Sequence, residues 1–341
     1  MLLTAMQART LLRVAAERHF ALLAINADSP AALYDCLCAA KQCDAPLMLE
    51  TSLWQLTGRS FGAGDAARGM ARYLADLALL CDSDEFRQVP VAYHTDHIKG
   101  DLTFPLLAAA IAGFPLRAGG QELRLRPSTI SLDSSQLSEE ENIELLCRLA
   151  QEGERLRVPV TLEMEAGVDD GVTPVAVTER LVDGVERRHP GQLFLFAPGV
   201  GTRHGFSADG YPGFSTAAVA EHCQAASRIC SRAIGIALHG SSGLSDAQLA
   251  AAVAAGVTKV NWSSDSLHLR AGAAAAYWRD AGPRLERSHR EFKATAMDDG
   301  VQRAIAATYV PEVVRRIGVL GAQGMAANVR AALAGAAGAV A

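Results

Sequence analysis

The sequence lacks the features of membrane-spanning and secreted chains. No apolar run approaches the roughly 20 residues that a membrane-spanning helix needs, and charged residues interrupt the first 20 positions, where a signal peptide would be apolar. The seven cysteines are an odd number in a chain of 341 residues and do not resemble the disulfide framework of a small secreted domain. We therefore expect a cytoplasmic protein with no membrane partner, beginning with an amphipathic helix.

An excess of positive charge is also missing. The 32 lysines and arginines are mixed with 37 aspartates and glutamates, which gives a formal net charge of −5. We therefore expect no nucleic-acid partner and favour a small-molecule partner. Cys36, Cys38 and Cys43 lie in a segment with helical spacing and have no fourth ligand nearby, so we expect buried thiols rather than a zinc site.

Hydrophobic residues make up 50% of the chain, which is enough for a large core and excludes disorder. Short β-rich runs alternate with alanine- and leucine-rich segments of helical spacing, the pattern of a parallel sheet covered on both faces. Helices are predicted at 31–40, 66–80, 139–152 and 246–255, the last with an N-cap at Ser245. Eight runs are predicted as strands: 20–26, 46–52, 89–96, 129–133, 159–165, 192–198, 235–239 and 257–261.

Eight strands close a (β/α)8 barrel, or TIM barrel, and the chain length suits that α/β fold. A doubly wound open sheet is the alternative. We expect a single domain over residues 1–341, with the barrel at about 18–290. The extension at about 291–341 is predicted to form additional C-terminal helices that flank the barrel or mediate oligomer contacts, and its alanine- and glycine-rich end is expected to fray.

Polar residues follow the predicted strands, where a barrel carries its active site. Because the carboxyl ends of the strands meet at one end of the barrel, we expect these residues to face one pocket. In chain order they are Asn26; Thr51 and Ser52; His94, Asp96 and His97; Asp133; Glu163 and Glu165; His204 and Gly205; His239, Gly240, Ser241 and Ser242; and Asn261, Ser263 and Ser264.

Three of these residues, His97, His204 and His239, come from separate strands and match a catalytic zinc set with an open fourth position. His94 is either a hydrogen-bond partner behind the ligands or a ligand itself. Asp133 and Glu165 either hold a second metal ion or balance the charge of the first site. The remaining histidines are expected at the surface: His19, His189, His222, His268 and His289.

Glycines and hydroxyl residues follow the last two strands. The segment at 239–243 reads His-Gly-Ser-Ser-Gly, and the segment at 261–264 reads Asn-Trp-Ser-Ser. Backbone N–H groups and hydroxyls beside a helix start are typical of the phosphate site of a barrel. The alternative is an ordinary glycine turn followed by a helix cap.

Six segments carry a resemblance to a known family: VPVAYHTDH, SLDSSQLSEEENIELL, VTLEMEAG, VGTRHGF, LHGSSG and GVTKVNWSSD. Over about residues 20–266 the chain resembles the class II, metal-dependent fructose-bisphosphate aldolases, a family that includes the tagatose-bisphosphate aldolases. The resemblance implies a carbon–carbon lyase of carbohydrate metabolism that acts on a ketose phosphate. By analogy with the family we also expect a homo-oligomer.

The resemblance also implies residue roles. Zn²⁺, or another divalent metal, would bind His97, His204 and His239, with Asp133 and Glu165 near an alternative metal position. Asp96 would be the proton-transferring carboxylate. The dihydroxyacetone phosphate part of the substrate would be held at Gly205, Gly240, Ser242, Asn261 and Ser264, with Thr51 or Ser52 near its phosphate; Asn26, Ser241 and Ser263 are further candidates for this pocket. A monovalent cation at the phosphate is a further candidate cofactor.

The chemistry agrees with these residue types. Cleavage of a ketose between C3 and C4 leaves an enediolate, whose negative charge needs a Lewis acid such as zinc. The C4 hydroxyl loses a proton in cleavage and regains it in condensation, which suits a carboxylate such as Asp96.

The chain departs from the family pattern at several positions. The loop after Glu165 is short, and Asp169 is a candidate replacement for the glutamate that moves a proton at the donor carbon. Ser207 stands where the family commonly has lysine, Ser263 where it has aspartate, and Ser241 where it has glycine. We identify no C-terminal arginine for a second phosphate, so the acceptor end of the pocket has changed most.

Two other functions remain open at this point. A non-catalytic barrel that supports another aldolase chain would explain the short loop, although it has no need of the three histidines. An epimerase or transaldolase would use the same metal and enediolate.

Overall fold

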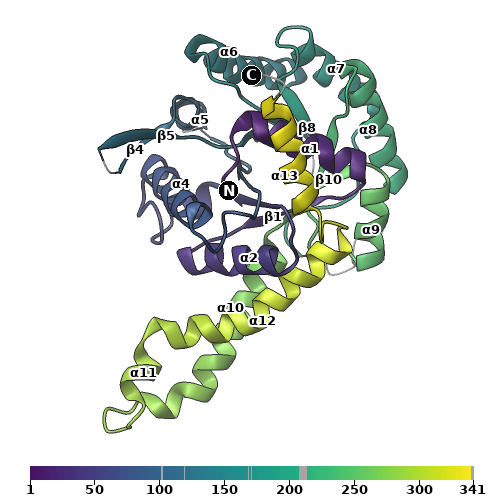
Figure 1. Ribbon diagram of the computed structural model, residues 1–341. Coiled ribbons are helices and arrows are strands. Elements are labelled where there is room, and N and C mark those ends of the chain that lie inside the picture. Colours follow the sequence, from purple (N-terminus) through teal and green to yellow (C-terminus); the bar gives the residue numbers. More distant parts are fainter. Residues whose placement is uncertain (101–102, 119, 168, 170, 207–212, 339–341) are drawn as a thin grey trace.

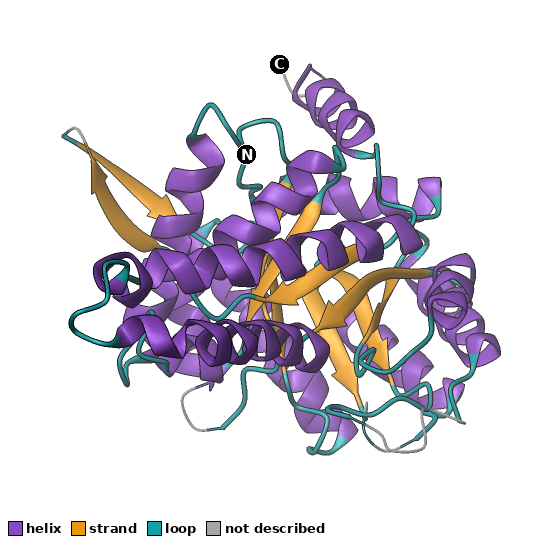
Figure 2. Ribbon diagram, turned by 90° about the horizontal axis from the view of Figure 1, so that it is seen from below, coloured by secondary structure: helices purple, strands orange, loops and turns teal. Residues whose placement is uncertain are grey.

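The chain folds into a closed barrel of parallel strands surrounded by helices (Figures 1 and 2). This computed structural model describes residues 1–100, 103–118, 120–167, 169, 171–206 and 213–338. Neighbouring strands pair in the order β1-β10-β9-β8-β7-β6-β3-β2 and close on β1. The barrel strands are β1 (Leu22–Asn26), β2 (Leu47–Thr51), β3 (Val91–Thr95), β6 (Thr129–Leu132), β7 (Leu162–Ala166), β8 (Leu193–Pro198), β9 (Gly235–Leu238) and β10 (Val257–Trp262). The predicted TIM barrel is confirmed, and the open sheet is wrong.

Helices between the strands cover the outside of the barrel (Figure 1). They are α2 (Pro30–Gln42), α3 (Leu53–Thr57), α4 (Ala66–Asp82), α5 (Thr103–Ala112), α6 (Glu139–Leu156), α7 (Val175–Glu186), α8 (Thr216–Cys230) and α9 (Asp246–Ala254). The predicted N-cap is confirmed, because the Ser245 side chain accepts a hydrogen bond from the backbone N–H of Gln248. The Gln248 side chain accepts one from the backbone N–H of Ser245 in return, a reciprocal cap that fixes the start of α9.

The first helix lies at the amino end of the barrel. Helix α1 (Ala5–Arg18) is amphipathic, as expected, and buries the face that carries Leu11 and Leu12. The Arg9 side chain donates hydrogen bonds to the Val160 carbonyl oxygen at 2.5 Å and to Thr161 Oγ1 at 3.1 Å, immediately before β7. These contacts place α1 at the end of the strands opposite to the one that carries the predicted site.

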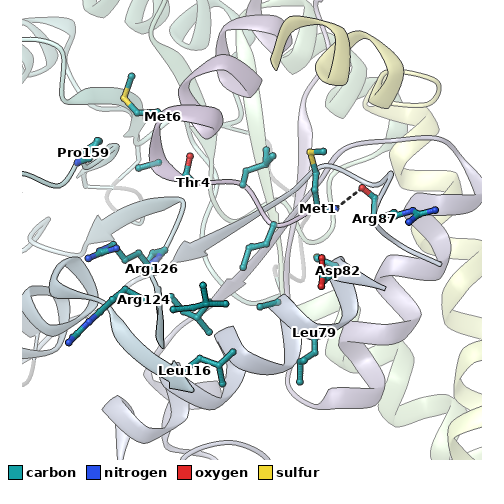
Figure 3. Close-up of a pocket in the computed structure, with 18 of the residues that line it drawn as sticks. Met1, Thr4, Met6, Leu79, Asp82, Arg87, Leu116, Arg124, Arg126 and Pro159 are labelled. Atoms are coloured by element: carbon teal, nitrogen blue, oxygen red, sulfur yellow. Dashed lines mark hydrogen bonds between the residues drawn. The ribbon is translucent and has the colours of Figure 1, made fainter. Parts of the chain in front are cut away.

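A two-stranded hairpin that the sequence analysis missed also lies at the amino end. Strands β4 (Phe114–Ala118) and β5 (Gln121–Leu125) pair antiparallel between α5 and β6 and extend away from the barrel (Figures 1 and 2). A cavity of about 1030 Å³ separates the hairpin from the N-terminal segment and the end of α4 (Figure 3), with Met6, Leu79 and Leu116 among its lining. None of the predicted site residues lines this cavity.

Additional C-terminal helices follow the last strand, as predicted. Helix α10 (Ser264–Ala281), the 3-10 turn η1 (Gly282–Leu285), α11 (Phe292–Ala296) and α12 (Asp298–Val319) form an arm that extends from the barrel (Figure 1). Helix α12 returns along α10 and α2, and α13 (Ala326–Gly338) packs against α1. The assignment of one domain, with its boundary near residue 290, stays a prediction. The tail end, residues 339–341, lies outside the described residues.

The remaining expectations have mixed outcomes. Cys36 and Cys43 are buried free thiols, Cys38 is half-buried, and no cysteine occurs in the candidate metal-binding groups of the described residues.

The expectation that His189 and His222 lie at the surface is wrong, because both rings are buried. His189 Nδ1 lies 2.8 Å from a Glu154 carboxylate oxygen, and His222 Nδ1 lies 2.7 Å from the Thr178 hydroxyl. A hydrogen-bond partner on a neighbouring helix makes burial of each imidazole tolerable.

Across the described part of the chain, no helix is both long and apolar enough to cross a bilayer.

Candidate active site

The three histidines predicted as metal ligands meet at the carboxyl end of the barrel. The ring centroid of His97 lies 4.3 Å from that of His204 and 4.6 Å from that of His239, and the His204 and His239 centroids are 5.8 Å apart. One nitrogen from each ring lies within 4.8 Å of the others. The barrel therefore brings together residues that are separated by up to 142 positions in the chain.

His97 follows β3 and adopts an unusual backbone conformation, with φ of 48°. The left-handed region is rarely used by residues other than glycine and clusters at functional sites. Its Nδ1 lies 2.9 Å from a Glu165 oxygen and 3.5 Å from an Asp133 oxygen. Burial disfavours the charged ring, but the carboxylates of Glu165, Asp96 and Asp133 outweigh burial and raise the pKa of His97 well above its usual value.

His239 and His204 are each held by one carboxylate. His239 Nε2 lies 2.9 Å from Glu163 Oε1, and burial, followed by the charge of His97, lowers the pKa of His239, which favours a neutral ring. The backbone N–H of His204 donates to Asp169 Oδ1 at 2.8 Å, and His204 Nδ1 lies 2.9 Å from both carboxylate oxygens. His204 is the most exposed of the three, with 39% of its side chain accessible.

These contacts leave one nitrogen of each ring for a metal ion. The carboxylates engage Nδ1 of His97, Nε2 of His239 and Nδ1 of His204. The remaining nitrogens of His97 and His239, Nε2 and Nδ1, face each other at 2.8 Å. Carboxylate-bound imidazoles that converge on one point are the usual ligands of catalytic zinc, so the residues fit a divalent metal.

Asp133 and Glu165 gather on the other side of the His97 ring, and the three residues form a second candidate metal-binding group. Lys99 Nζ also approaches Asp133, at 3.2 Å. Both carboxylates therefore contact the charge of His97 directly, as the charge-balancing interpretation requires. A second metal ion at this group stays a prediction.

Asp96 lies buried beside the histidines and is held by two amides. The Asn26 amide donates to one carboxylate oxygen at 3.0 Å, and the Asn261 amide donates to the other at 2.8 Å. Burial alone would raise the pKa of Asp96, but the charges of His97, Lys259 and His239 and the Asn26 hydrogen bond lower it below its usual value. The carboxylate is therefore ionised and fixed at one position.

Most of the predicted substrate-binding residues line one small cavity beside the histidines. Its volume is about 30 Å³. The lining residues are Asn26, Asp96, His97, His204, Gly205, Gly240, Ser241, Ser242, Asn261, Ser263 and Ser264. Thr51 and Ser52 do not line it, because the Thr51 hydroxyl bonds the Tyr93 hydroxyl at 2.6 Å and Ser52 caps α3.

The glycine and serine segment after β9 is shaped by close backbone contacts. Gly240 has φ of 64°, and a Cβ there would meet the Arg203 carbonyl oxygen at 2.4 Å. The Ser241 hydroxyl is buried and donates to the Asn261 carbonyl, whereas the Ser242 hydroxyl accepts from the backbone N–H of Asp265, in the first turn of α10. The segment is therefore tied to the start of α10, where unpaired N–H groups favour an anion.

A buried ionic group behind the histidines was not expected from the sequence. Lys259 of β10 and Glu50 of β2 are completely buried, and Lys259 Nζ lies 3.3 Å from a Glu50 oxygen and 3.0 Å from a Glu163 oxygen. His94 also belongs here, with Nδ1 2.8 Å from the Thr129 hydroxyl and Nε2 3.6 Å from Glu163. Because Glu50, His94 and Asp96 also form a candidate metal-binding group, both interpretations of His94, as a hydrogen-bond partner or as a ligand, stay predictions.

Comparison with known proteins assigns the chain to a family. The family described as fructose-bisphosphate aldolase class-II matches residues 6–324. Two similar relatives are fructose-bisphosphate aldolases of Ureaplasma parvum, 27% identical over 76% of this chain and 79% of the relative, and of Streptococcus pneumoniae, 27% identical over 84% and 88%.

Solved structures share the fold. A fructose-bisphosphate aldolase from Campylobacter jejuni has a TM-score of 0.78 at 20% identity, covering 94% of this chain and 95% of its own. The YdjI aldolase from Escherichia coli has a TM-score of 0.68 at 17% identity, covering 96% and 100%.

Fold and family together define an aldehyde-lyase built on a TIM barrel. The chain belongs to the class II fructose-bisphosphate aldolase family, and the protein is a class II aldolase, a carbon–carbon lyase of carbohydrate metabolism. The family is metal-dependent, and the candidate metal-binding groups described above agree with that property.

Proposed function

We propose that this protein is a zinc-dependent aldolase that cleaves or forms the C3–C4 bond of a ketose phosphate with a dihydroxyacetone phosphate-type donor. The observation that carries this proposal is the convergence of His97, His204 and His239 beside the buried Asp96 carboxylate. A zinc ion bound to these imidazoles would act as a Lewis acid toward the carbonyl and C2 oxygens of the substrate.

The donor phosphate is proposed to bind at the start of α10. Ser263 precedes the helix and makes no capping hydrogen bond with its side chain, and Ser242, Ser263 and Ser264 line the cavity. Apart from the N–H of Asp265, which donates to Ser242, the N–H groups of the first helical turn and these hydroxyls are suitable donors to phosphate oxygens. Gly240 supports this arrangement, since a larger residue would collide with the Arg203 backbone.

The proton of the C4 hydroxyl is proposed to move to and from Asp96. The two amides of Asn26 and Asn261 hold its carboxylate in one orientation, so it accepts a proton from a fixed position. Asp169 is proposed to lie close to the donor carbon, although both of its oxygens contact His204. The acceptor aldehyde is left open, because the sequence offers no C-terminal arginine for a second phosphate and Ser207 lies outside the described residues.

Metal analysis and one substitution test the proposal. The purified protein is expected to contain stoichiometric divalent metal, and Asp96→Ala is expected to lower retro-aldol turnover by about 10²–10⁴-fold while the metal is retained. Asp84→Asn is the control, because the Asp84 side chain is 92% exposed in a surface ion pair. Absence of stoichiometric metal, or undiminished turnover in Asp96→Ala, contradicts the proposal.

Product analysis separates this function from those that share its chemistry. Candidate ketose phosphates are supplied to the protein, and the products are examined for free aldehyde, an epimer or a transferred donor unit. Free aldehyde supports the aldolase, whereas an epimer or transferred product replaces it with an epimerase or transaldolase. We further propose that the protein is a cytoplasmic homo-oligomer, which sedimentation and fractionation of the native protein test.

A further inference from the structure

The barrel interior contains charged side chains where such barrels are normally filled with branched apolar residues. Lys259 of β10, Glu50 of β2 and Glu163 of β7 have side chains with no accessible surface. Burial raises the pKa of Glu50 well above its usual value, and removing even one ammonium and one carboxylate from water carries a large desolvation penalty, which good geometry offsets only in part. Stability of the core alone therefore gives no reason for these residues.

Glu163 connects the buried ammonium to a histidine of the metal-ligand set. Lys259 Nζ lies 3.0 Å from Glu163 Oε2 and 3.2 Å from Oε1. Glu163 Oε1 also lies 2.9 Å from His239 Nε2. Glu50 approaches Lys259 from β2, at 3.3 Å, so the ammonium is held between two strands. Lys259 does not line the small cavity; its charge helps to keep Asp96 ionised, and its contact with the metal-ligand set runs through Glu163.

The ammonium decides which nitrogen of His239 carries the proton. A lysine ammonium only donates hydrogen bonds, so a Glu163 carboxylate facing it remains an acceptor. The His239 ring must then donate from Nε2 to Glu163, which leaves the lone pair of Nδ1 toward His97 Nε2, 2.8 Å away. In the opposite tautomer Nδ1 would carry the proton and could not bind a metal ion, and the bare Nε2 would face an acceptor oxygen of Glu163 at 2.9 Å.

We propose that Lys259 is a positioning residue of the metal centre: through Glu163 it orients His239 and fixes the tautomer that presents Nδ1 to a divalent cation. This inference deepens the proposed function and rests on its zinc site. Glu50 holds the ammonium from the opposite side of the barrel. The charge of Lys259, rather than its bulk, is the property that matters.

Zinc affinity of the full-length metal-free protein tests this role independently of turnover. Competition with a chromophoric chelator is measured for the wild type, Lys259→Met and Lys259→Arg. Lys259→Met is expected to bind zinc about 10–100-fold more weakly, as is typical when a partner of a metal ligand is lost, and to change the cobalt(II) absorption spectrum. Lys259→Arg retains the charge and is expected to recover part of the affinity.

Thr258→Val is the matched control. Thr258 neighbours Lys259 on β10, is buried, and has a hydroxyl without a hydrogen-bond partner; the hydroxyl lies against Gly235 of β9, where an added Cβ would collide with it. Valine has nearly the same shape, so zinc affinity is expected to stay at the wild-type value. A general disturbance of β10 would weaken zinc binding in both variants and would contradict a specific role of Lys259.

The possible outcomes separate the two proposals. If the wild type does not bind zinc at the three histidines, the proposed function and this inference both fail. If the wild type binds zinc and Lys259→Met binds it equally tightly, only this inference fails. Should Lys259→Met not fold, the double variant Lys259→Met/Glu50→Gln, which also replaces the second carboxyl group beside Lys259, is measured instead.

A measurement on the zinc-loaded wild type needs no variant. Nitrogen NMR of the histidine side chains is expected to show His239 protonated at Nε2 and coordinated through Nδ1. Protonation at Nδ1 would overturn the inference whatever the variants show.

Discussion

Asp169 holds His204 through both its backbone and its ring. Its oxygens accept from the backbone N–H of His204 and lie 2.9 Å from Nδ1. We predict that Asp169→Asn weakens zinc binding by about 10–100-fold, because the amide no longer fixes the ring as a carboxylate does. Exchange of the donor-carbon proton by the zinc-saturated variant is measured in parallel.

The two readouts separate positioning from proton transfer. Weakened zinc binding with retained exchange indicates a residue that orients His204. Unchanged zinc binding with lost exchange indicates the proton-transfer role that the family resemblance implies. Asp183→Asn is the control, since Asp183 pairs only with a surface arginine, Arg187, within α7.

Metal binding is predicted to expel a proton from His97. The surrounding carboxylates raise the pKa of His97 well above its usual value of 6.5, so the ring of the metal-free protein is charged at neutral pH. In the metal-free protein this charge contributes stability below pH 6.5 that is lost as pH rises through the raised pKa. Zinc must displace the proton, so its affinity increases with pH up to that pKa.

Calorimetry at pH 7 in buffers of different ionisation enthalpy measures the proton count directly. We expect about one proton released per zinc ion bound. Glu165→Gln removes the carboxylate closest to Nδ1 of His97, at 2.9 Å, and is expected to reduce the release. Zinc binding without proton release would contradict a charged His97.

The residues at the strand ends could be predicted from the sequence because each follows an apolar run. The three histidines, Asp96 and the serines of the small cavity all have this signal. Lys259 was missed because β10 was interpreted as an apolar strand with a polar end. A usable signal was present: Lys259 and Asn261 are two positions apart and therefore share the inward face of β10.

At the scale of elements, a buried ion pair joins α10 to α2. Arg270 donates to Asp35 at 2.7 Å, and each side chain is only 9% exposed. The Arg270 guanidinium lies over the Tyr309 ring of α12, which stacks on Trp262 with an interplanar angle of 6°. Because Trp262 follows Asn261 on β10, this group of residues connects the arm to the candidate site.

We predict that Asp35→Ala lowers the free energy of unfolding by about 3 kcal/mol, because Arg270 then stays buried with only a distant contact, 4.0 Å from its Nε to Asp28. The double variant Asp35→Leu/Arg270→Met is expected to lose much less, since no charge is left unpaired. Urea unfolding measures both. Glu17→Ala is the control: its pair with Arg13 is exposed on α1 and is worth less than about 1 kcal/mol. Equal losses in the single and double variants would contradict the prediction.

Elements whose apolar residues recur regularly could be predicted from the sequence. Elements with a mixed pattern of apolar and polar residues could not. Most of the barrel strands are largely apolar runs, and the cap at Ser245 marks α9. The β4–β5 hairpin alternates leucines with arginines and includes Pro115, so its strands resemble a polar loop. His222 was assigned to the surface because helical spacing alone does not reveal that Thr178 on α7 faces it.

For the whole molecule, zinc is expected to contribute to global stability. A ligand that binds only the folded chain stabilises it by about 2.7 kcal/mol at a concentration of 100 times Kd. Removal of metal by a chelator is therefore predicted to lower the unfolding midpoint, and re-addition of zinc to restore it. His204→Ala, at the most exposed of the three ligands, is expected to abolish the difference. A chelator-induced shift that persists in this variant would show that zinc binds elsewhere.

The hairpin and the three histidines lie at opposite ends of the barrel. The hairpin connects a helix to the start of a strand, so it emerges at the end of the barrel away from the histidines. The hairpin can therefore accept a fluorescent label, an affinity tag or a surface tether without obstructing the path of a sugar to the opposite mouth. An immobilised form of the protein is best anchored there, with its catalytic opening turned toward the solution.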